Sequence, residues 1–369
     1  MPPFALCRIE GHDRYQEVST NSGVARARRV GRRRVHTDGI VAAHGWLVHV
    51  FPRVSRYGEI GVEVFFVISG FVMALVTQGL SPGIQSARSF ICARIARIVP
   101  LYWILTALFI ALVAFVPGVP EAFGHARVSA WHALSSFLFL PSMSWTGMAA
   151  PVLGVGWTLN YEMWFYAVFA AAMCVTRRRL LAVGAFLLLT SALHLLPGEG
   201  VAFAFYTNPL VLEFVFGCCV GAWYATGRTV PVAAAAGLLV AVAAAGVFAP
   251  RLTDTNRFLV FGLPALAVVV AGLSVESKVR WNRWLERIGD ASYSLYLTHL
   301  LAMPVVVGFM QMIDARHRLP GDLIGGAVVV ASTAVALGSY RWVERPASRA
   351  VASWIAGLSW GSAVAGAKR

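Results

Sequence analysis

The residues most able to do chemistry in this chain are polar and ionisable side chains that interrupt long apolar runs. His49 lies in one run, Asn160 and Glu162 lie in another, and Glu63 stands near the start of a third. Such groups are costly in an apolar environment, so each is a functional candidate. His49 is the candidate base, because an imidazole has an ordinary pKa of about 6.5. The alternatives are a packing histidine and, for Glu162, an ion pair that only fixes helix packing.

Helical geometry sorts these candidates by direction. His44 lies five residues before His49 and therefore on a different face, which indicates a structural role. Trp157 and Asn160 are three residues apart and share a stripe. Glu162 points about 200° away from Asn160, so we expect the two to meet different partners.

A second polar stripe lies near the C-terminal end of the chain. Ser292, Tyr296 and His299 are spaced i, i+4, i+7 and so share one helical face. A polar face of this kind is wasteful against lipid, which favours a cavity lined by Tyr296 and His299. The alternative is hydrogen bonding between packed helices.

Arg94 and Arg97 stand on one face at the start of an apolar run. Guanidinium forks match phosphate oxygens, so this pair is a candidate phosphate clamp. The alternative is an anchor that only sets membrane orientation.

Motifs of several common catalytic and binding chemistries are absent from the sequence. It contains no P-loop and no dinucleotide-binding glycine fingerprint. The five cysteines form no C-x-x-C pair and have no zinc-like spacing with histidine. We expect no metal, no structural disulfide and no permanently bound cofactor.

The elements that position these residues must be membrane helices. Of 369 residues, 58% are hydrophobic and only 13% are charged, about half the charged share of a soluble protein. The net charge of +14 sits in short clusters between apolar runs, which is the pattern of membrane topology rather than of nucleic-acid binding. We predict an all-α, polytopic transmembrane bundle that contacts membrane lipids and no nucleic acid.

A bilayer core needs about 20 apolar residues per helix. On that scale the sequence contains ten candidate spans, at residues 40–57, 60–79, 98–117, 152–175, 180–197, 205–226, 231–249, 258–275, 288–310 and 321–340. Residues 131–148 are apolar but short, which indicates a re-entrant or interfacial helix. Alternate loops hold 14 and 7 Lys and Arg residues, so the richer set is predicted to be cytoplasmic, together with both termini.

Three parts follow along the chain. Residues 1–38 carry eight arginines and no apolar stretch, and we predict a disordered, cytoplasmic basic arm or a misassigned start. Residues 39–346 form the membrane domain. Residues 347–369 form a cytoplasmic or interfacial tail.

Four motifs taken together resemble the acyltransferase-3 family of integral membrane O-acyltransferases, and most of all its exopolysaccharide acetyltransferase branch. The resemblance extends in order over about residues 40–346. The motifs are Gly61–Phe71, Arg94–Trp103, Gly156–Glu162 and Gly289–His299, with further similarity at Leu212–Gly217 and Glu344–Pro346.

This resemblance implies an inner-membrane enzyme of about ten helices. Such an enzyme moves an acyl group, usually acetyl, from cytosolic acyl-CoA to a hydroxyl of an exported polysaccharide or lipid-linked glycan. It makes His49 the base, assigns CoA binding to Arg94 and Arg97, and makes Asn160 and Glu162 catalytic. Glu63, Trp157, Tyr296 and His299 are then candidates for binding the acceptor or the developing oxyanion.

One position departs from the family pattern. An arginine usually stands eleven residues before the first-helix histidine, and here that position is Asp38. An inactive homologue is therefore one alternative function. A transporter or flippase of a glycan intermediate is another, because it too would hold polar residues at the midplane.

Overall fold

The computed structural model describes residues 60–123, 125–247, 256–276, 278, 282–314 and 318–366. The predicted basic arm 1–38, the first predicted span 40–57 and His49 lie outside the described residues.

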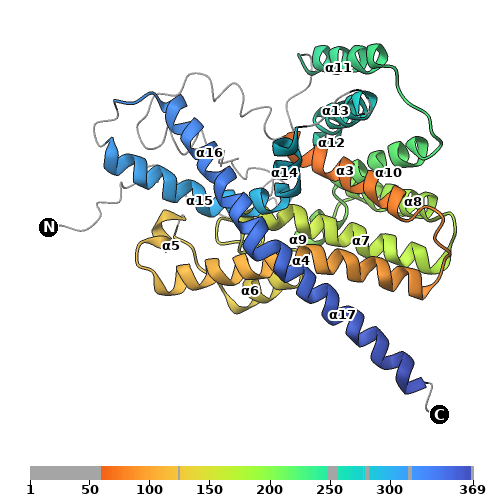
Figure 1. Ribbon diagram of the computed structural model, residues 1–369, viewed down its shortest axis with the longest axis horizontal. Coiled ribbons are helices and arrows are strands. Elements are labelled where there is room, and N and C mark those ends of the chain that lie inside the picture. The colour runs from red at the N-terminus through yellow and green to blue at the C-terminus, as the bar shows by residue number, and fades with distance from the viewer. Residues whose placement is uncertain are drawn as a thin grey trace.

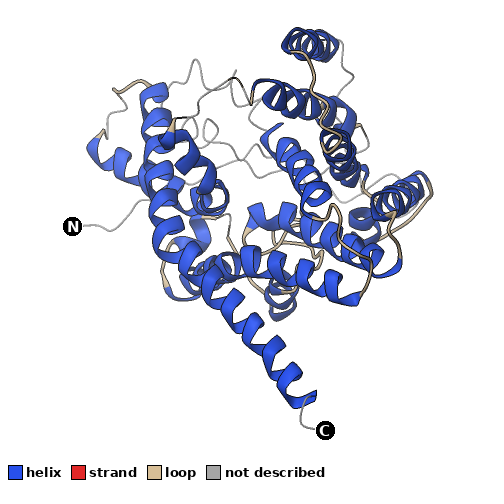
Figure 2. Ribbon diagram, turned by 45° about the vertical axis from the view of Figure 1, so that its right-hand side comes forward, coloured by secondary structure: helices blue, strands red, loops and turns tan. Residues whose placement is uncertain are grey.

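Every regular element in the described part of the chain is a helix, which confirms the all-α prediction (Figure 2). Short 3-10 turns stand at Gly154–Gly156, Leu193–Leu195 and Pro209–Val211, and a π turn at Tyr340–Glu344 joins the last two helices. The helices are α3 Ile60–Val76, α4 Ile84–Phe115, α5 Val119–Ala122, α6 Ala130–Phe137, α7 Trp157–Val175, α8 Arg179–Ala192, α9 Val201–Tyr206, α10 Leu212–Tyr224, α11 Val232–Val247, α12 Arg257–Val260, α13 Gly262–Val275, α14 Arg283–Asp290, α15 Ser292–Ile313, α16 Gly321–Ser339 and α17 Arg345–Gly366.

Several of these helices suit a bilayer. Five helical stretches of the described chain are long and apolar enough to cross a membrane, and α3, α8 and α11 are shorter apolar helices. Each predicted span beyond residue 59 overlaps a helix. The chain is therefore a multi-pass membrane protein, whereas the count of ten spans stays a prediction.

Two predicted boundaries are refined by the structure. Helix α4 begins at Ile84 rather than near residue 98, so Arg94 and Arg97 lie within one continuous 32-residue helix. Residues 131–148 supply only the short helix α6, whose first turn is capped by Ser129 through a bond from the His132 amide. The remainder of that segment is irregular.

Helices α3 and α10 pack at unusually close range, and three glycines make this possible. A Cβ atom on Gly70 would lie 2.0 Å from the carbonyl oxygen of Phe214, and one on Gly217 would lie 2.0 Å from that of Val67. Gly221 meets Phe71 in the same way. Small residues at such spacing let membrane helices approach backbone to backbone, which fixes the polar side chains of α3.

The core lies where α3, α4, α7, α10 and α15 meet (Figure 1). The ring of Phe66 on α3 packs at a tilt against that of Phe214 on α10, with 4.6 Å between centroids, and Phe214 stacks at 4.4 Å on Phe165 of α7. Helix α15 pairs with α16, and α17 continues from the π turn across α4 and beyond the other helices (Figure 1). This aromatic core separates two groups of polar residues on α3 and α7.

Candidate active site

The first polar group surrounds Glu162 of α7, and we call Ser69, Glu162 and Tyr166 the Glu162 cluster. Ser69 of α3 donates a 3.1 Å hydrogen bond to Oε1 of Glu162, and the Tyr166 hydroxyl donates to the same oxygen. Glu162 is only 4% exposed, and its Oε2 has no hydrogen-bond partner among the described residues. Two neutral hydroxyls therefore hold the Glu162 carboxyl group, and no described cation forms an ion pair with it.

Arg94 and Arg97 of α4 supply positive charge to this cluster from a distance. Both interact electrostatically with Glu162, and neither forms an ion pair with it in the described structure. Arg94 also borders an open cavity of about 420 Å³ between the end of α3 and the start of α4, and its Nε is buried there without a hydrogen-bond partner in the described chain. Of the predicted phosphate clamp, Arg94 therefore borders the cavity, and both arginines act on Glu162 from a distance.

A second carboxylate near Arg97 was not among the predicted site residues. Ser294 of α15 donates a 2.6 Å hydrogen bond to Glu344 in the π turn, and Arg97 interacts electrostatically with that glutamate. The Tyr293 hydroxyl donates a 2.7 Å bond to the carbonyl oxygen of Ile98. These contacts attach α15 and the π turn to the part of α4 that carries Arg97.

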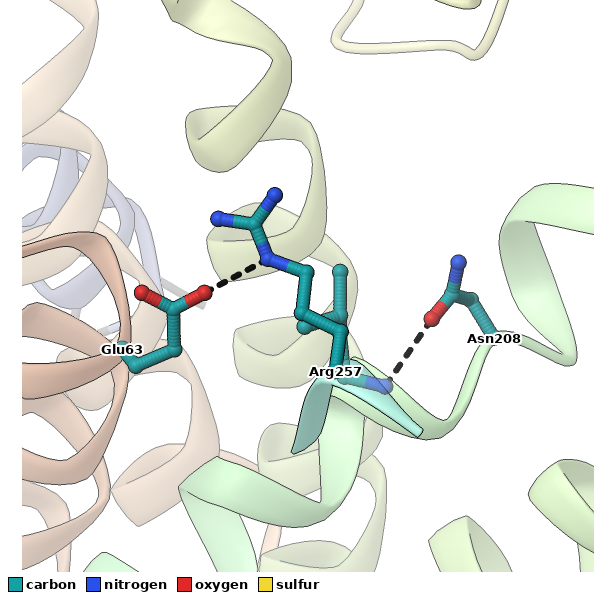
Figure 3. A network of polar contacts seen from close by, with 4 residues as sticks. Glu63, Asn208 and Arg257 are labelled. Atoms are coloured by element: carbon teal, nitrogen blue, oxygen red, sulfur yellow. Dashed lines mark hydrogen bonds and ion pairs between the residues drawn. The ribbon is translucent and has the colours of Figure 1, made fainter. Parts of the chain in front are cut away.

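The second polar group surrounds Glu63, and we call Glu63, Glu213 and Arg257 the Glu63 cluster. Nε of Arg257 on α12 lies 2.6 Å from Oε1 of Glu63, whose side chain is fully buried (Figure 3). The same guanidinium lies over the ring of Trp157, at 5.7 Å, and over that of Phe261, at 5.8 Å. Two of the predicted acceptor-binding residues, Glu63 and Trp157, are thus brought together by Arg257.

Glu213 of α10 completes this cluster. It is fully buried, and neither carboxylate oxygen has a hydrogen-bond partner among the described residues. It interacts electrostatically with Glu63 and Arg257. Its carboxyl group packs on Gly262, where a Cβ atom would lie 3.0 Å from Oε1. The glycine at the start of α13 therefore makes room for a second carboxylate beside one arginine.

Tyr296 of α15 stands between the two clusters. Its hydroxyl donates a 2.7 Å hydrogen bond to the carbonyl oxygen of Val155 and accepts a 2.8 Å bond from Thr158. It interacts electrostatically with Glu162 on one side and with Glu63 and Arg257 on the other. The two clusters are about 9 Å apart along the axis of α3, because Glu63 and Ser69 are separated by six residues of that helix.

The other predicted residues of these helices have their own partners. The Nδ2 of Asn160 is 3.4 Å from the carbonyl oxygen of Leu140, and its buried Oδ1 has no partner in the described chain. Asn160 and Glu162 therefore meet different partners, as helix geometry predicted. His299 contacts the Leu295 carbonyl oxygen at 3.1 Å, and its ring lies 6.1 Å from that of Tyr296, whereas Ser292 is exposed.

Sequence reasoning missed the long-range partners. Arg257 was not among the predicted site residues, yet it contacts Glu63 directly from 194 positions away in the chain. Ser69 lies inside the motif Gly61–Phe71 and Tyr166 lies four residues after the motif Gly156–Glu162, but neither was singled out as a site residue. No cluster of three or more His, Cys, Asp or Glu that would suit a metal occurs in the part of the chain described here.

Comparison with known proteins identifies the family to which these buried clusters belong. Residues 36–341 match the acyltransferase-3 family, described as an acyltransferase domain. This match spans both clusters and His49. No solved structure matches the chain.

Three characterised relatives illustrate the range of similarity. The exopolysaccharide production protein ExoZ of Rhizobium meliloti is 34% identical over 320 residues, which cover 82% of this chain and 94% of that protein. The acyltransferase MdmB of Streptomyces mycarofaciens is 27% identical, over 80% of this chain and 82% of its own. The peptidoglycan O-acetyltransferase OatA of Listeria monocytogenes is 23% identical, over 79% of this chain and 51% of its own.

Proposed function

The chain belongs to the acyltransferase-3 family of membrane acyltransferases, and from this premise we propose that it moves an acetyl group from cytosolic acetyl-CoA to a hydroxyl of an exported polysaccharide or lipid-linked glycan. The observation that carries the proposal is the family match over both buried polar clusters. The similarity to an exopolysaccharide production protein and to a peptidoglycan O-acetyltransferase favours a glycan acceptor.

The donor binds at the end of the bundle that carries Arg94 and Arg97. The cavity beside Arg94 has a volume of about 420 Å³, which is within the usual range of small-molecule sites. Ser86 and Ser89 offer hydroxyls along one wall, and Phe90 with Val76 offers apolar surface. Cations, hydroxyls and apolar surface together suit the phosphates and the pantetheine arm of acyl-CoA.

The acceptor binds on the side of the Glu63 cluster. Sugars present hydroxyls for carboxylates and guanidinium groups, and apolar ring faces for aromatic side chains. Glu63, Arg257 and Trp157 supply all three kinds of group in contact with one another. The ion pair uses Nε of Arg257, which leaves the terminal nitrogens of the guanidinium directed past the Glu63 carboxylate (Figure 3).

The reaction needs a base, a donor for the oxyanion and a leaving thiolate that takes up a proton. His49 removes the proton from the acceptor hydroxyl as its oxygen attacks the thioester carbonyl. Asn160, Tyr296 or His299 donates to the developing oxyanion. The carbon–sulfur bond breaks, and the proton taken by His49 goes to the CoA sulfur. Glu162 orients the base or stabilises its charged form.

This assignment fixes an orientation in the membrane. A cytosolic donor requires the Arg94 end of α4 to face the cytoplasm, and the positive loops agree with it. We therefore propose a location in the bacterial inner membrane with both termini in the cytoplasm. The Glu63 cluster then lies toward the outer face, where the acceptor is found.

The test is acetyl transfer by membranes that hold the full chain, with acetyl-CoA labelled in the acetyl group. We compare the wild type with His49→Ala and with His44→Ala, a nearby histidine that the sequence spacing predicts to lie on another helical face. Label should enter glycan with the wild type and His44→Ala and should be lost with His49→Ala at equal expression. Undiminished transfer by His49→Ala would remove this histidine from the mechanism. Failure of all three well-expressed proteins to label any glycan would contradict the proposed reaction.

A further inference from the structure

A second cavity lies at the end of the bundle where α3, α7 and α10 finish. It has a volume of about 340 Å³ and is open to the outside. Its wall combines the turn after α3, the start of α8 and the end of α10. The lining includes Arg177, Arg178, Arg179, Thr77 and Gln78, and no acidic residue. Three consecutive guanidinium groups at one cavity favour an anion.

Arg179 is the residue that distinguishes this cavity from an ordinary basic loop. It is only 8% exposed, and its Nη2 donates to the carbonyl oxygen of Leu80. Its Nη1 is buried with no hydrogen-bond partner among the described residues. A buried charged donor left unpaired is expensive. An arginine that only set membrane orientation would instead keep its charge in water, as the exposed Arg177 and Arg178 do.

The start of α8 adds to the attraction for an anion. Arg178 is the N-cap residue of this 14-residue helix, and Arg179 is its first residue. The N-terminus of a helix carries partial positive charge and unpaired amide groups, which favour phosphate. Guanidinium forks bind phosphate oxygens in pairs.

We propose that this cavity is a phosphate-binding site, separate from the cavity beside Arg94. The turn between α3 and α4 divides the two, because Leu80 lines the Arg94 cavity while its carbonyl oxygen accepts from Arg179. The phosphate belongs either to the nucleotide end of the CoA donor, a source that rests on the proposed function, or to the headgroup of an anionic lipid. Both sources present the same group to the same three arginines.

The test uses the full chain in nanodiscs of phosphatidylcholine, with coenzyme A and 3′-dephospho-coenzyme A as soluble probes. A parallel set of nanodiscs contains phosphatidylglycerol, and the lipid that stays bound is counted by native mass spectrometry. The main variant is the double substitution Arg177→Gln with Arg178→Gln, because both side chains are exposed. Arg179→Gln is the second variant. Arg349→Gln, an exposed arginine of α17 that lines neither cavity, is the control.

We expect both variants to weaken one phosphate ligand about tenfold or more, the loss expected for a charge-assisted hydrogen bond, and Arg349→Gln to change neither. Weaker binding of coenzyme A, with dephospho-coenzyme A unaffected, would identify the 3′-phosphate of the donor. Loss of retained phosphatidylglycerol would identify the lipid. If neither ligand responds to the double variant, the proposal is overturned. If the wild type binds no coenzyme A, the proposed donor fails, and the lipid measurement alone decides the cavity.

Discussion

The Glu162 and Glu63 clusters each bury a carboxylate in the same bundle but compensate its charge in opposite ways. Glu63 contacts a guanidinium at 2.6 Å, whereas the hydrogen bonds to Glu162 in the described part of the chain come from the hydroxyls of Ser69 and Tyr166, and Arg94 and Arg97 act on it from a distance. Direct pairing cancels most of a charge and fixes its position. A carboxylate held by hydroxyls keeps a field that can act on a neighbouring reaction. From this difference we propose that the Glu63 cluster positions the acceptor and that the Glu162 cluster takes part in the chemistry.

The largest expected effect comes from breaking the direct pair. Arg257→Gln removes the guanidinium from beside two buried carboxylates, Glu63 and Glu213. Removing one partner of a buried ion pair costs about 3–5 kcal/mol. We expect a clear fall in the midpoint of thermal unfolding of the purified protein in detergent.

Three controls test the cause of that fall. Arg257→Lys keeps the charge and should retain most of the stability, and the combination of Arg257→Gln with Glu63→Gln should recover part of it. Arg97→Gln, which breaks no direct pair with Glu162, should move the midpoint little. Equal midpoints for Arg257→Gln and the wild type would mean that the pair does not compensate the buried charge.

The next largest effect concerns the charge of Glu162. Glu162→Gln preserves the size of the side chain and an oxygen that can accept from Ser69 and Tyr166, but removes the negative charge. We expect acetyl transfer to fall about 100-fold at saturating donor and acceptor, the usual scale for losing one electrostatic contribution to a transition state. Initial rates in membranes with labelled acetyl-CoA measure this.

Glu63→Gln is the matched substitution in the other cluster. It should leave kcat within a few-fold of the wild type and raise the KM for the glycan acceptor. If Glu63→Gln lowers kcat as strongly as Glu162→Gln, the division between positioning and chemistry is wrong.

A smaller effect on transfer is expected from replacing Arg97, one of the two arginines that act on Glu162 from a distance. Arg97→Gln should raise the KM for acetyl-CoA about tenfold, because one charge-assisted hydrogen bond to phosphate is worth about 1.5–3 kcal/mol. The kcat should stay nearly unchanged. Arg88→Gln, an exposed position two to three turns earlier on α4, is the control and should change neither constant. A fall in kcat without a change in KM would instead place Arg97 with the chemistry of Glu162.

Local patterns in the sequence predicted the helices and the directions of their polar residues. The different partners of Asn160 and Glu162 follow from a rotation of 100° per residue. Gly217 of α10 ends the motif Leu212–Gly217 that the sequence already shows, although its close approach to Val67 of α3 appears only when the two helices are docked. The apolar runs marked the spans but placed the start of α4 too late, because its first turns are polar.

The pairings between distant segments could not be predicted in this way. Arg257 and Glu63 are 194 positions apart, and Ser294 and Glu344 are 50 apart. No periodicity connects such residues, since their contact depends on how α3, α12, α15 and the π turn pack. A basic residue at the start of an apolar helix looks the same whether it faces water or a buried carboxylate. The direct pair of the Glu63 cluster therefore appeared only with the fold.

The smallest expected effect asks whether the two clusters act together through Tyr296. Tyr296→Phe removes the hydroxyl that bonds Val155 and Thr158, at a cost of about 1 kcal/mol, or roughly fivefold in transfer. Combined separately with Glu162→Gln and with Glu63→Gln in double-mutant cycles, it should show a coupling of about 0.5 kcal/mol or more to each. Coupling to Glu162 alone would assign Tyr296 to the oxyanion side of the reaction, and additivity with both would mean that it only ties α15 to α7. Coupling to both would mean that one residue serves both the acceptor positioning by Glu63 and the chemistry at Glu162, as we expect if the two substrates reach the site from opposite sides of the membrane.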